Sequence, residues 1–197
     1  MRIFGIDPGS ERTGYGCVES DGRRHVLVAC GAIAAPPGDA FPIRLARIHT
    51  ELSALLASCR PDCVAIENLF HANNVRSALK LGHARGVAML AAVEAGCEVV
   101  EYTPAAIKRA VVGYGRAEKA QIGQMVKLLL GLTAPPSPHD AADALAVAIC
   151  HLHSMSPRGT GLKTRPYTTD LGGVGAGLQT RPRRPKSWRQ YRPPAHG

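Results

Sequence analysis

Residues 2–34, RIFGIDPGSERTGYGCVESDGRRHVLVACGAIA, contain three short apolar segments separated by turn-forming residues. The segments 2–7, 14–20 and 25–34 predict three β-strands, because each is rich in strand-forming or small apolar residues and is bounded by Pro, Gly, Asp or Ser. The SDGRR turn at 20–24 is short enough to join the second strand to the third as a hairpin. This stretch therefore predicts that the fold starts as an antiparallel sheet.

The chain that follows alternates between helical and extended patterns. Apolar spacing predicts helices over 41–59 and 75–95, whereas 62–68 and 97–102 have the composition of strands. Three more helices are expected over 103–113, 117–131 and 138–153. Hairpin-linked strands followed by strands that alternate with helices predict an α/β fold with a five-stranded mixed sheet flanked by helices.

Positive charge is concentrated at the C-terminal end. The net charge is +9, and residues 151–197 hold nine of the 24 Lys and Arg residues but one of the 15 acids. The same stretch has six prolines, seven glycines and no apolar periodicity, which predicts disorder. We expect a folded domain over 1–156 and a basic, Pro/Gly-rich disordered tail over 157–197. Such a tail favours a polyanionic partner, although basic tails are common.

Cysteine spacing and hydropathy argue against several classes of protein. The six cysteines include no C-x-x-C pair, which predicts reduced core residues rather than a disulfide framework or a zinc site. The first residues lack the apolar segment of a secretory signal, and no apolar run approaches the length of a membrane span. We therefore expect a cytoplasmic protein without a membrane partner.

Four acids stand in otherwise apolar surroundings: Asp7, Glu67, Asp140 and Asp143. Asp7 ends the first strand and Glu67 ends the fourth, and a crossover that lays these strands side by side would make the two acids neighbours. Asp140 and Asp143 share a helix face because they are three residues apart. The alanines around them would let this helix approach the sheet closely, so we expect the four carboxylates to meet.

Crowded carboxylates need compensating positive charge, because burial and mutual repulsion both raise their pKa values. Two Mg²⁺ ions would offset four negative charges, and Mg²⁺ prefers oxygen ligands. Two such ions about 3.5–4 Å apart can stabilise the attacking and leaving oxygens of a phosphodiester displacement. Three of the acids also have an ordinary structural explanation. Asp140 could interact favourably with the dipole at the start of its helix, Asp143 could pair with an Arg or His139, and Asp7 could be a turn residue. Together the four favour a metal site.

The motifs around these acids resemble those of the RuvC family, the bacterial Holliday junction resolvases. The similar segments lie in the family's order between Arg2 and about His153, and they are GIDPGSERTGYG, AIENLFHANN, SALKLGHARGVA, VVGYGRAEKAQI and HDAADALAVA. The resemblance implies a ribonuclease H-like nuclease domain over 1–156, a homodimer, and magnesium-dependent paired nicking of four-way DNA junctions that leaves 5′-phosphate ends. It also implies the RuvA–RuvB branch-migration complex as a partner.

The resemblance further implies the role of each acid. Asp7, Glu67, Asp140 and Asp143 match the family's catalytic metal ligands, with two Mg²⁺ per active site and Mn²⁺ as the alternative ion. The third position is aspartate in some members and histidine in others. Here Asp140 occupies it, which leaves His139 as a nearby helper or a helix-cap residue.

Basic and aromatic residues near the acids are candidates for DNA contacts. Lys108 and Lys119 match basic residues of the family near the scissile phosphate, where a lysine can stabilise the charge of the transition state. Phe70 matches an aromatic that the family places near the junction centre, and an exposed aromatic can stack on unpaired bases. Packing of Phe70 into the core is the alternative. The other candidates are Asn73, Arg76, Lys80, Arg109 and Arg116.

The helix expected over 75–95 carries small residues at helical spacing: Gly82, Ala84, Gly86 and Ala88. Small side chains permit a close approach by another element. Packing on the sheet is one interpretation, and a dimer seam is the one that the family implies.

Three other functions fit parts of the sequence. An Asp-x-Gly turn after the first strand also occurs in actin-like and sugar-kinase ATPases, but that fold usually needs two such domains and the ordered part of this chain supplies one. A noncatalytic junction-binding protein that relies on its basic tail would not need four acids. A ribonuclease H-like enzyme acting on an RNA–DNA hybrid is disfavoured by the Phe70 segment and by the VVGYGRAEK match.

Overall fold

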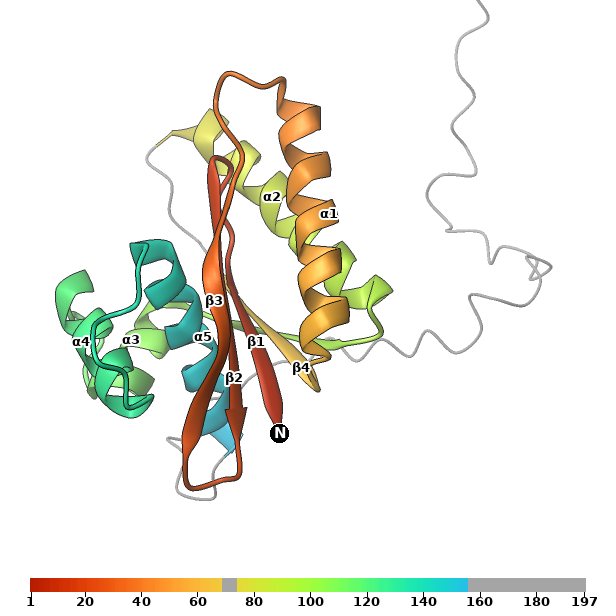
Figure 1. Cartoon of the computed structure of the whole chain (residues 1–197). Coiled ribbons are helices and arrows are strands. Elements are labelled where there is room, and N and C mark those ends of the chain that lie inside the picture. Colours follow the sequence, from red (N-terminus) through yellow and green to blue (C-terminus); the bar gives the residue numbers. More distant parts are fainter. Residues whose placement is uncertain (69–73, 156–197) are drawn as a thin grey trace, which may run out of the picture.

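The computed structural model describes residues 1–68 and 74–155 of the 197-residue chain. Within these residues a five-stranded mixed sheet carries helices on both faces (Figure 1). The elements in chain order are β1 (Arg2–Asp7), β2 (Arg12–Ser20), β3 (His25–Ala34), α1 (Phe41–Cys59), β4 (Cys63–Glu67), α2 (Val75–Glu94), β5 (Glu98–Tyr102), α3 (Pro104–Val112), α4 (Lys119–Leu129) and α5 (His139–Met155). The predicted fold class and sheet are confirmed, and the helix and strand bounds differ from the predicted ones by two residues at most.

The strand order β3-β2-β1-β4-β5 brings the start and the middle of the chain together. The strands β1, β2 and β3 pair antiparallel, whereas β4 pairs parallel to both β1 and β5. Ile6 lies opposite Ile66 in the register of β1 with β4. The expected crossover is therefore confirmed, and Asp7 and Glu67 end neighbouring parallel strands at the same edge of the sheet.

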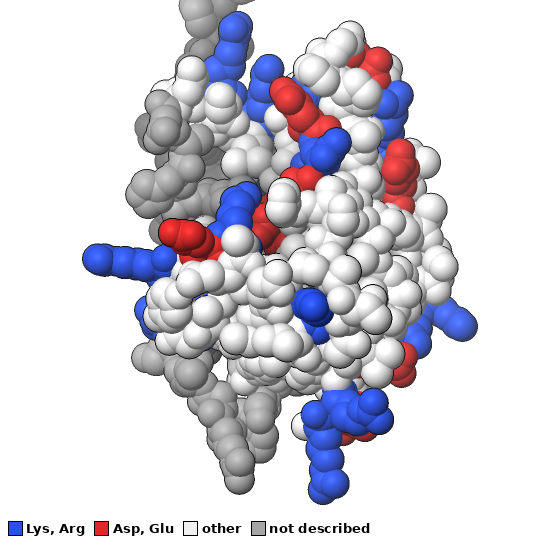
Figure 2. Space-filling model, turned by 60° about the vertical axis from the view of Figure 1, so that its left-hand side comes forward, with Lys and Arg blue, Asp and Glu red and all other residues white. Residues whose placement is uncertain are grey.

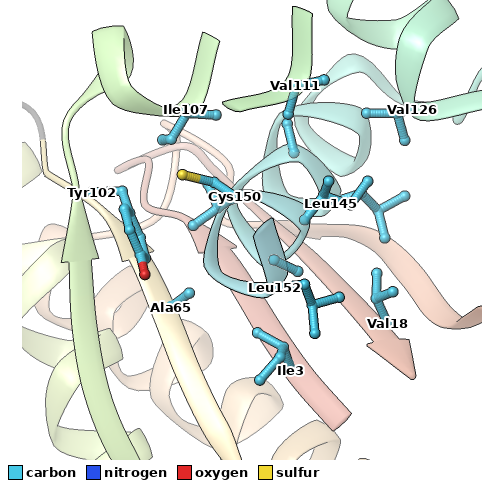
Figure 3. Packing of buried hydrophobic residues seen from close by; sticks show 14 of the residues in the cluster. Ile3, Val18, Ala65, Tyr102, Ile107, Val111, Val126, Leu145, Cys150 and Leu152 are labelled. Carbon is cyan, nitrogen blue, oxygen red and sulfur yellow. The ribbon is translucent and has the colours of Figure 1, made fainter. Parts of the chain in front are cut away.

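Each face of the sheet has its own core, because successive strand residues point to opposite sides. On one face α1 and α2 cover Phe4, Ile6 and Ile66. On the other, α5 lies directly on Ile3 and Val18, and α3 and α4 cover the outer side of α5 (Figure 3). The helix α5 is thus enclosed on both sides, which explains why a 17-residue helix contains so few polar residues.

Two glycines of the sheet allow α5 to lie against β1 and β2. A side chain on Gly5 would clash with the carbonyl oxygen of Ala144, and one on Gly14 would clash with the carbonyl oxygen of Asp140. Since Gly14 pairs with Asp7 across the β1–β2 ladder, this contact brings the first turn of α5 to the end of β1. The glycines of the sheet complement the alanines of the helix.

Two smaller expectations bear on the class of protein. The six cysteines are free and five of them are buried, in agreement with reduced core residues. No helix in the described part of the chain is long and apolar enough to span a membrane.

Candidate active site

Three of the four predicted acids line one pocket at the edge of the sheet. Asp7 comes from the end of β1, Glu67 from the end of β4, and Asp143 from α5. With Lys108 of α3 and Lys119 of α4 they surround a pocket of about 290 Å³. Residues that are far apart in the sequence therefore meet in one small volume that contains both signs of charge.

The fourth acid, Asp140, lies beside this pocket and is not among the residues that line it. Its backbone rests on Gly14, and its carboxylate lies 3.7 Å from the guanidinium of Arg12, the first residue of β2. The expectation that four carboxylates meet is therefore fulfilled for three, whereas Asp140 lies beside the pocket and forms an ion pair with Arg12.

The environment of the two strand-end acids favours their protonated forms. Burial, followed by the charge and hydrogen bond of Glu67, raises the pKa of Asp7 to about 8. Burial also raises the pKa of Glu67, although its hydrogen bond with Asp7 and the nearby Lys119 and Lys108 oppose this rise. Burial and the closeness of the two carboxyls thus raise the pKa values of both Asp7 and Glu67.

Asp143 is paired with a lysine. The ammonium of Lys119 donates a hydrogen bond to its carboxylate at 3.3 Å, and the charge of Asp143 is the main cause that raises the pKa of Lys119. Lys119 and Arg12 thus offset part of the negative charge of the acids on α5.

The donor set suits a divalent cation, although its side chains are not gathered around one. In the described residues no three His, Cys, Asp or Glu side chains form a group that could hold a metal ion as they stand. The chemistry still fits, because all the donors are carboxylate oxygens, which Mg²⁺ prefers, and the crowded acids require compensating positive charge.

The other basic candidates lie outside the pocket. Arg109 and Arg116 are exposed near it, and Arg76 is exposed at the start of α2. The ammonium of Lys80 lies 5.9 Å from the centre of the Phe41 ring, a cation–π arrangement. Figure 2 shows acidic and basic side chains next to one another across the upper part of the α3–α4–α5 side, above a large area with few charged side chains.

Three sequence candidates remain without a described contact in the pocket. Phe70 and Asn73 lie outside the described residues. His139 is exposed as the first residue of α5 and does not line the pocket.

The roles of Arg12, Gly5 and Gly14 were not predicted from the sequence. Arg12 had no signal of its own in the sequence, because its role depends on which residue the first turn of α5 reaches. The presence of Gly5 and Gly14 in strands could have indicated the contact with α5, since glycine inside a strand often marks the close approach of another backbone.

Comparison with known proteins identifies relatives over most of the chain. A family model described as crossover junction endodeoxyribonuclease RuvC matches residues 3–151. A crossover junction endodeoxyribonuclease RuvC from Alkaliphilus oremlandii is 53% identical over 154 residues, which cover 78% of this chain and 94% of the relative. Another from Koribacter versatilis is 54% identical over 158 residues, which cover 79% and 95%.

A solved structure agrees with the sequence matches. The structure of T. thermophilus RuvC in complex with Holliday junction substrate superposes with a TM-score of 0.73 at 37% identity, and covers 77% of this chain and 92% of that chain. RuvC structures have a ribonuclease H-like fold, as this sheet and its helices do. RuvC proteins are nucleases that depend on divalent metal ions, which suits a pocket lined by carboxylates. Fold, motifs and relatives agree, and the chain belongs to the RuvC family.

Proposed function

We propose that this protein is a crossover junction endodeoxyribonuclease that resolves Holliday junctions in DNA recombination and repair by nicking two opposed strands. The observation that carries the proposal is the pocket in which Asp7, Glu67 and Asp143 meet Lys108 and Lys119. Its family supports the substrate, because one RuvC structure contains a Holliday junction and the relatives are named for junction cleavage.

The four acids are the proposed metal ligands, for two Mg²⁺ ions with Mn²⁺ as the alternative. When bound, such ions activate a water for attack on the phosphodiester and stabilise the leaving 3′ oxygen. Burial raises the pKa of both Asp7 and Glu67, so any proton held by this pair would have to pass to solvent water before both carboxyls could bind the metal. Lys108 and Lys119 approach the pocket from α3 and α4 and would supply positive charge toward the reacting phosphate, which remains on the 5′ end of the cut strand.

Paired nicking requires two active sites, and α2 supports the proposal of a homodimer. Its outer face exposes Leu79 and Leu90, whose exposed fractions are 60% and 50%. Gly82 and Gly86 lie on this face in an apolar groove of about 500 Å³, whereas Ala84 and Ala88 are buried against the sheet. The small residues of α2 therefore fall into two groups, and the exposed group suits a second copy of the chain.

Further DNA contacts are proposed around the pocket. Phe70 would stack on bases at the junction centre, with Asn73 beside it, while Arg76, Lys80, Arg109 and Arg116 would contact phosphates. Replacement of Phe70 by Ala should leave junction binding largely intact and slow the cutting. A clearly lower melting temperature in this variant would instead place Phe70 in the core.

The nuclease domain over 1–156 and the tail over 157–197 are proposed as separate functional parts. The excess of Lys and Arg in the tail would add affinity for any DNA without selecting its sequence or shape. We also retain the RuvA–RuvB complex as the proposed partner and the cytoplasm, where bacterial DNA lies, as the proposed place of action.

The proposed function is tested by cutting of a synthetic four-way junction beside a linear duplex of the same sequence, with Mg²⁺, with Ca²⁺ and without metal. We expect paired nicks in opposed strands of the junction with Mg²⁺ and little cutting of the duplex. Binding without cutting in Mg²⁺ would favour a noncatalytic junction-binding protein. An RNA–DNA hybrid in the same assay separates junction cleavage from ribonuclease H-type activity.

A further inference from the structure

Arg12 lies next to the candidate metal site and has no role in the reaction described so far. Its guanidinium is 3.7 Å from the carboxylate of Asp140. Asp7, Glu67 and Asp143 line the pocket, whereas Asp140 does not. The acid that stands apart from the others is thus the acid that Arg12 contacts.

The backbone on both sides of Arg12 is held firmly. The backbone N–H of Ala35 donates a hydrogen bond to the carbonyl of Glu11 at 2.8 Å. On the other side, the hydroxyl of the fully buried Thr13 donates to the carbonyl of Gly9 at 2.9 Å. The root of the Arg12 side chain is therefore fixed at the edge of the pocket.

The far end of the same side chain is free to turn. The Arg12 side chain is 58% exposed, and its contact with Asp140 is at the long end of the range for an ion pair. An arginine that is anchored at its root and exposed at its head can exchange one anionic partner for another at low cost, and DNA phosphate is the anion that a junction nuclease brings to this edge.

Asp143, one turn further along α5, has a comparable partner. The ammonium of Lys119 lies 3.3 Å from its carboxylate, and the Lys119 side chain is 76% exposed. Both acids of α5 are thus paired with exposed basic side chains of the protein itself, whereas Asp7 and Glu67 are paired with each other.

We propose that Arg12 is a counter-ion of Asp140 that competes with the metal in the free protein and moves to a DNA phosphate when the junction binds. Its departure leaves the Asp140 carboxylate free to act as a metal ligand. DNA binding and metal binding thereby strengthen each other, and thermodynamic linkage requires the effect to be reciprocal. The inference rests on the metal site of the proposed function and adds to it a means by which substrate promotes metal loading.

The first test measures Mn²⁺ binding to the full-length protein without DNA by titration calorimetry. Arg12→Gln removes an exposed ion pair that competes with the metal for Asp140. Of the two proposed metal ions, the one with the larger dissociation constant should therefore bind about two- to fivefold more tightly in this variant. Arg12→Lys, which keeps the charge, should bind Mn²⁺ more nearly like the wild type. Arg23→Gln removes an equal charge from the turn at the other end of β2 and should leave Mn²⁺ affinity unchanged.

The second test measures junction binding in EDTA as a function of salt. Loss of one phosphate contact should reduce the salt slope by about one in Arg12→Gln, and the slope should stay unchanged in Arg23→Gln. A lower salt slope in Arg12→Gln alone would support the move of Arg12 to a DNA phosphate. A purely structural role of Arg12 would not combine a lower salt slope with tighter Mn²⁺ binding.

Two results would overturn the inference. If Mn²⁺ affinity is unchanged or weaker in Arg12→Gln, Arg12 does not compete with the metal for Asp140. If the salt slope of junction binding is unchanged, Arg12 does not move to a DNA phosphate. Failure of the proposed function is a separate result, because a wild-type protein that binds Mn²⁺ and junctions but does not cut them still gives both readings.

Discussion

The helices α5 and α2 are both rich in alanine and lie on opposite faces of the sheet, yet their surroundings differ. From Ala144 to Leu152 every residue of α5 is buried, between the sheet and α3 and α4. The buried residues of α2 are four alanines, and its outer face exposes Leu79 and Leu90. An enclosed helix is held rigidly and can present acids at a fixed place, whereas a helix with an exposed apolar face is suited to assembly.

Removal of an acid at the enclosed face should have the largest effect. We expect Asp7→Asn, Glu67→Gln and Asp143→Asn each to slow junction cutting by about 10²- to 10³-fold or more, because stabilisation of transition-state charge is lost. Junction binding without metal should survive, since each change removes negative charge beside DNA. Rates measured under single-turnover conditions, with binding measured in EDTA, test this. Near-normal cutting by Asp143→Asn at ordinary Mg²⁺ would exclude Asp143 as a ligand.

Glycine-to-alanine changes compare the two faces directly. Gly5→Ala should lower the free energy of unfolding by about 2–4 kcal/mol, because the new methyl group meets the backbone of α5. Gly82→Ala meets nothing within 4 Å in the single chain and should stabilise α2 by about 0.5–1 kcal/mol. Denaturant unfolding of both variants gives the comparison. Equal tolerance of the two changes would mean that α5 does not lie on the sheet as closely as described.

A charge on the exposed face of α2 should separate assembly from folding. In Leu79→Glu we expect at least about tenfold weaker dimerisation, because burying an unpaired carboxylate in an apolar interface is costly. Since Leu79 is already exposed in the single chain, the melting temperature of the monomer should change little. Sedimentation velocity measures the first effect, and a shift from paired to single nicks should accompany it. A variant that remains dimeric would place the subunit contact elsewhere.

The pH dependence of stability should come from the enclosed side of the sheet. The pKa of Asp7 rises from 3.8 to about 8 on folding, so the folded protein binds more protons than the unfolded protein between these values. The free energy of unfolding of the metal-free protein should therefore fall as pH rises through this window, by up to about 1.4 kcal/mol per pH unit.

Two variants separate this slope from other titrations. Asp7→Asn should flatten the slope, and Gly82→Ala on the opposite face should retain it. Saturating Mg²⁺ should also reduce the slope, because a bound cation replaces the proton. A slope that persists in Asp7→Asn would assign the titration to another group.

The meeting of Asp7 with Glu67 could be predicted from the sequence because few topologies are allowed. Short hairpins fixed the first three strands, and the helix over 41–59 required a crossover, which usually lays the next strand beside the first. The position of α5 could be predicted only in part. Its alanines predicted a close approach, but the partner glycines in β1 and β2 become meaningful only when the helix is laid across them.

Interactions that depend on side-chain direction could not be predicted from spacing. Arg12 and Asp140 are brought together by the register of β2 and the packing of α5, neither of which leaves a local pattern. Lys80 turns toward the ring of Phe41, a residue of a different helix. On α2, Gly82 and Gly86 are four residues apart, as are Ala84 and Ala88. Only the orientation of the helix on the sheet shows that the glycines are on the outer face and the alanines are buried.

The presence of one metal site at the ends of β1, β4 and α5 is tested most directly by cleavage of the protein chain with bound iron. Fe²⁺ in place of Mg²⁺, with ascorbate and peroxide, generates hydroxyl radicals that cut the backbone near the ion. We expect cuts near residues 7, 67 and 140–143, suppressed by excess Mg²⁺ and weakened in Asp143→Asn. Cuts confined to other parts of the chain, or cuts at these places that Mg²⁺ does not suppress, would contradict a metal site at this edge of the sheet.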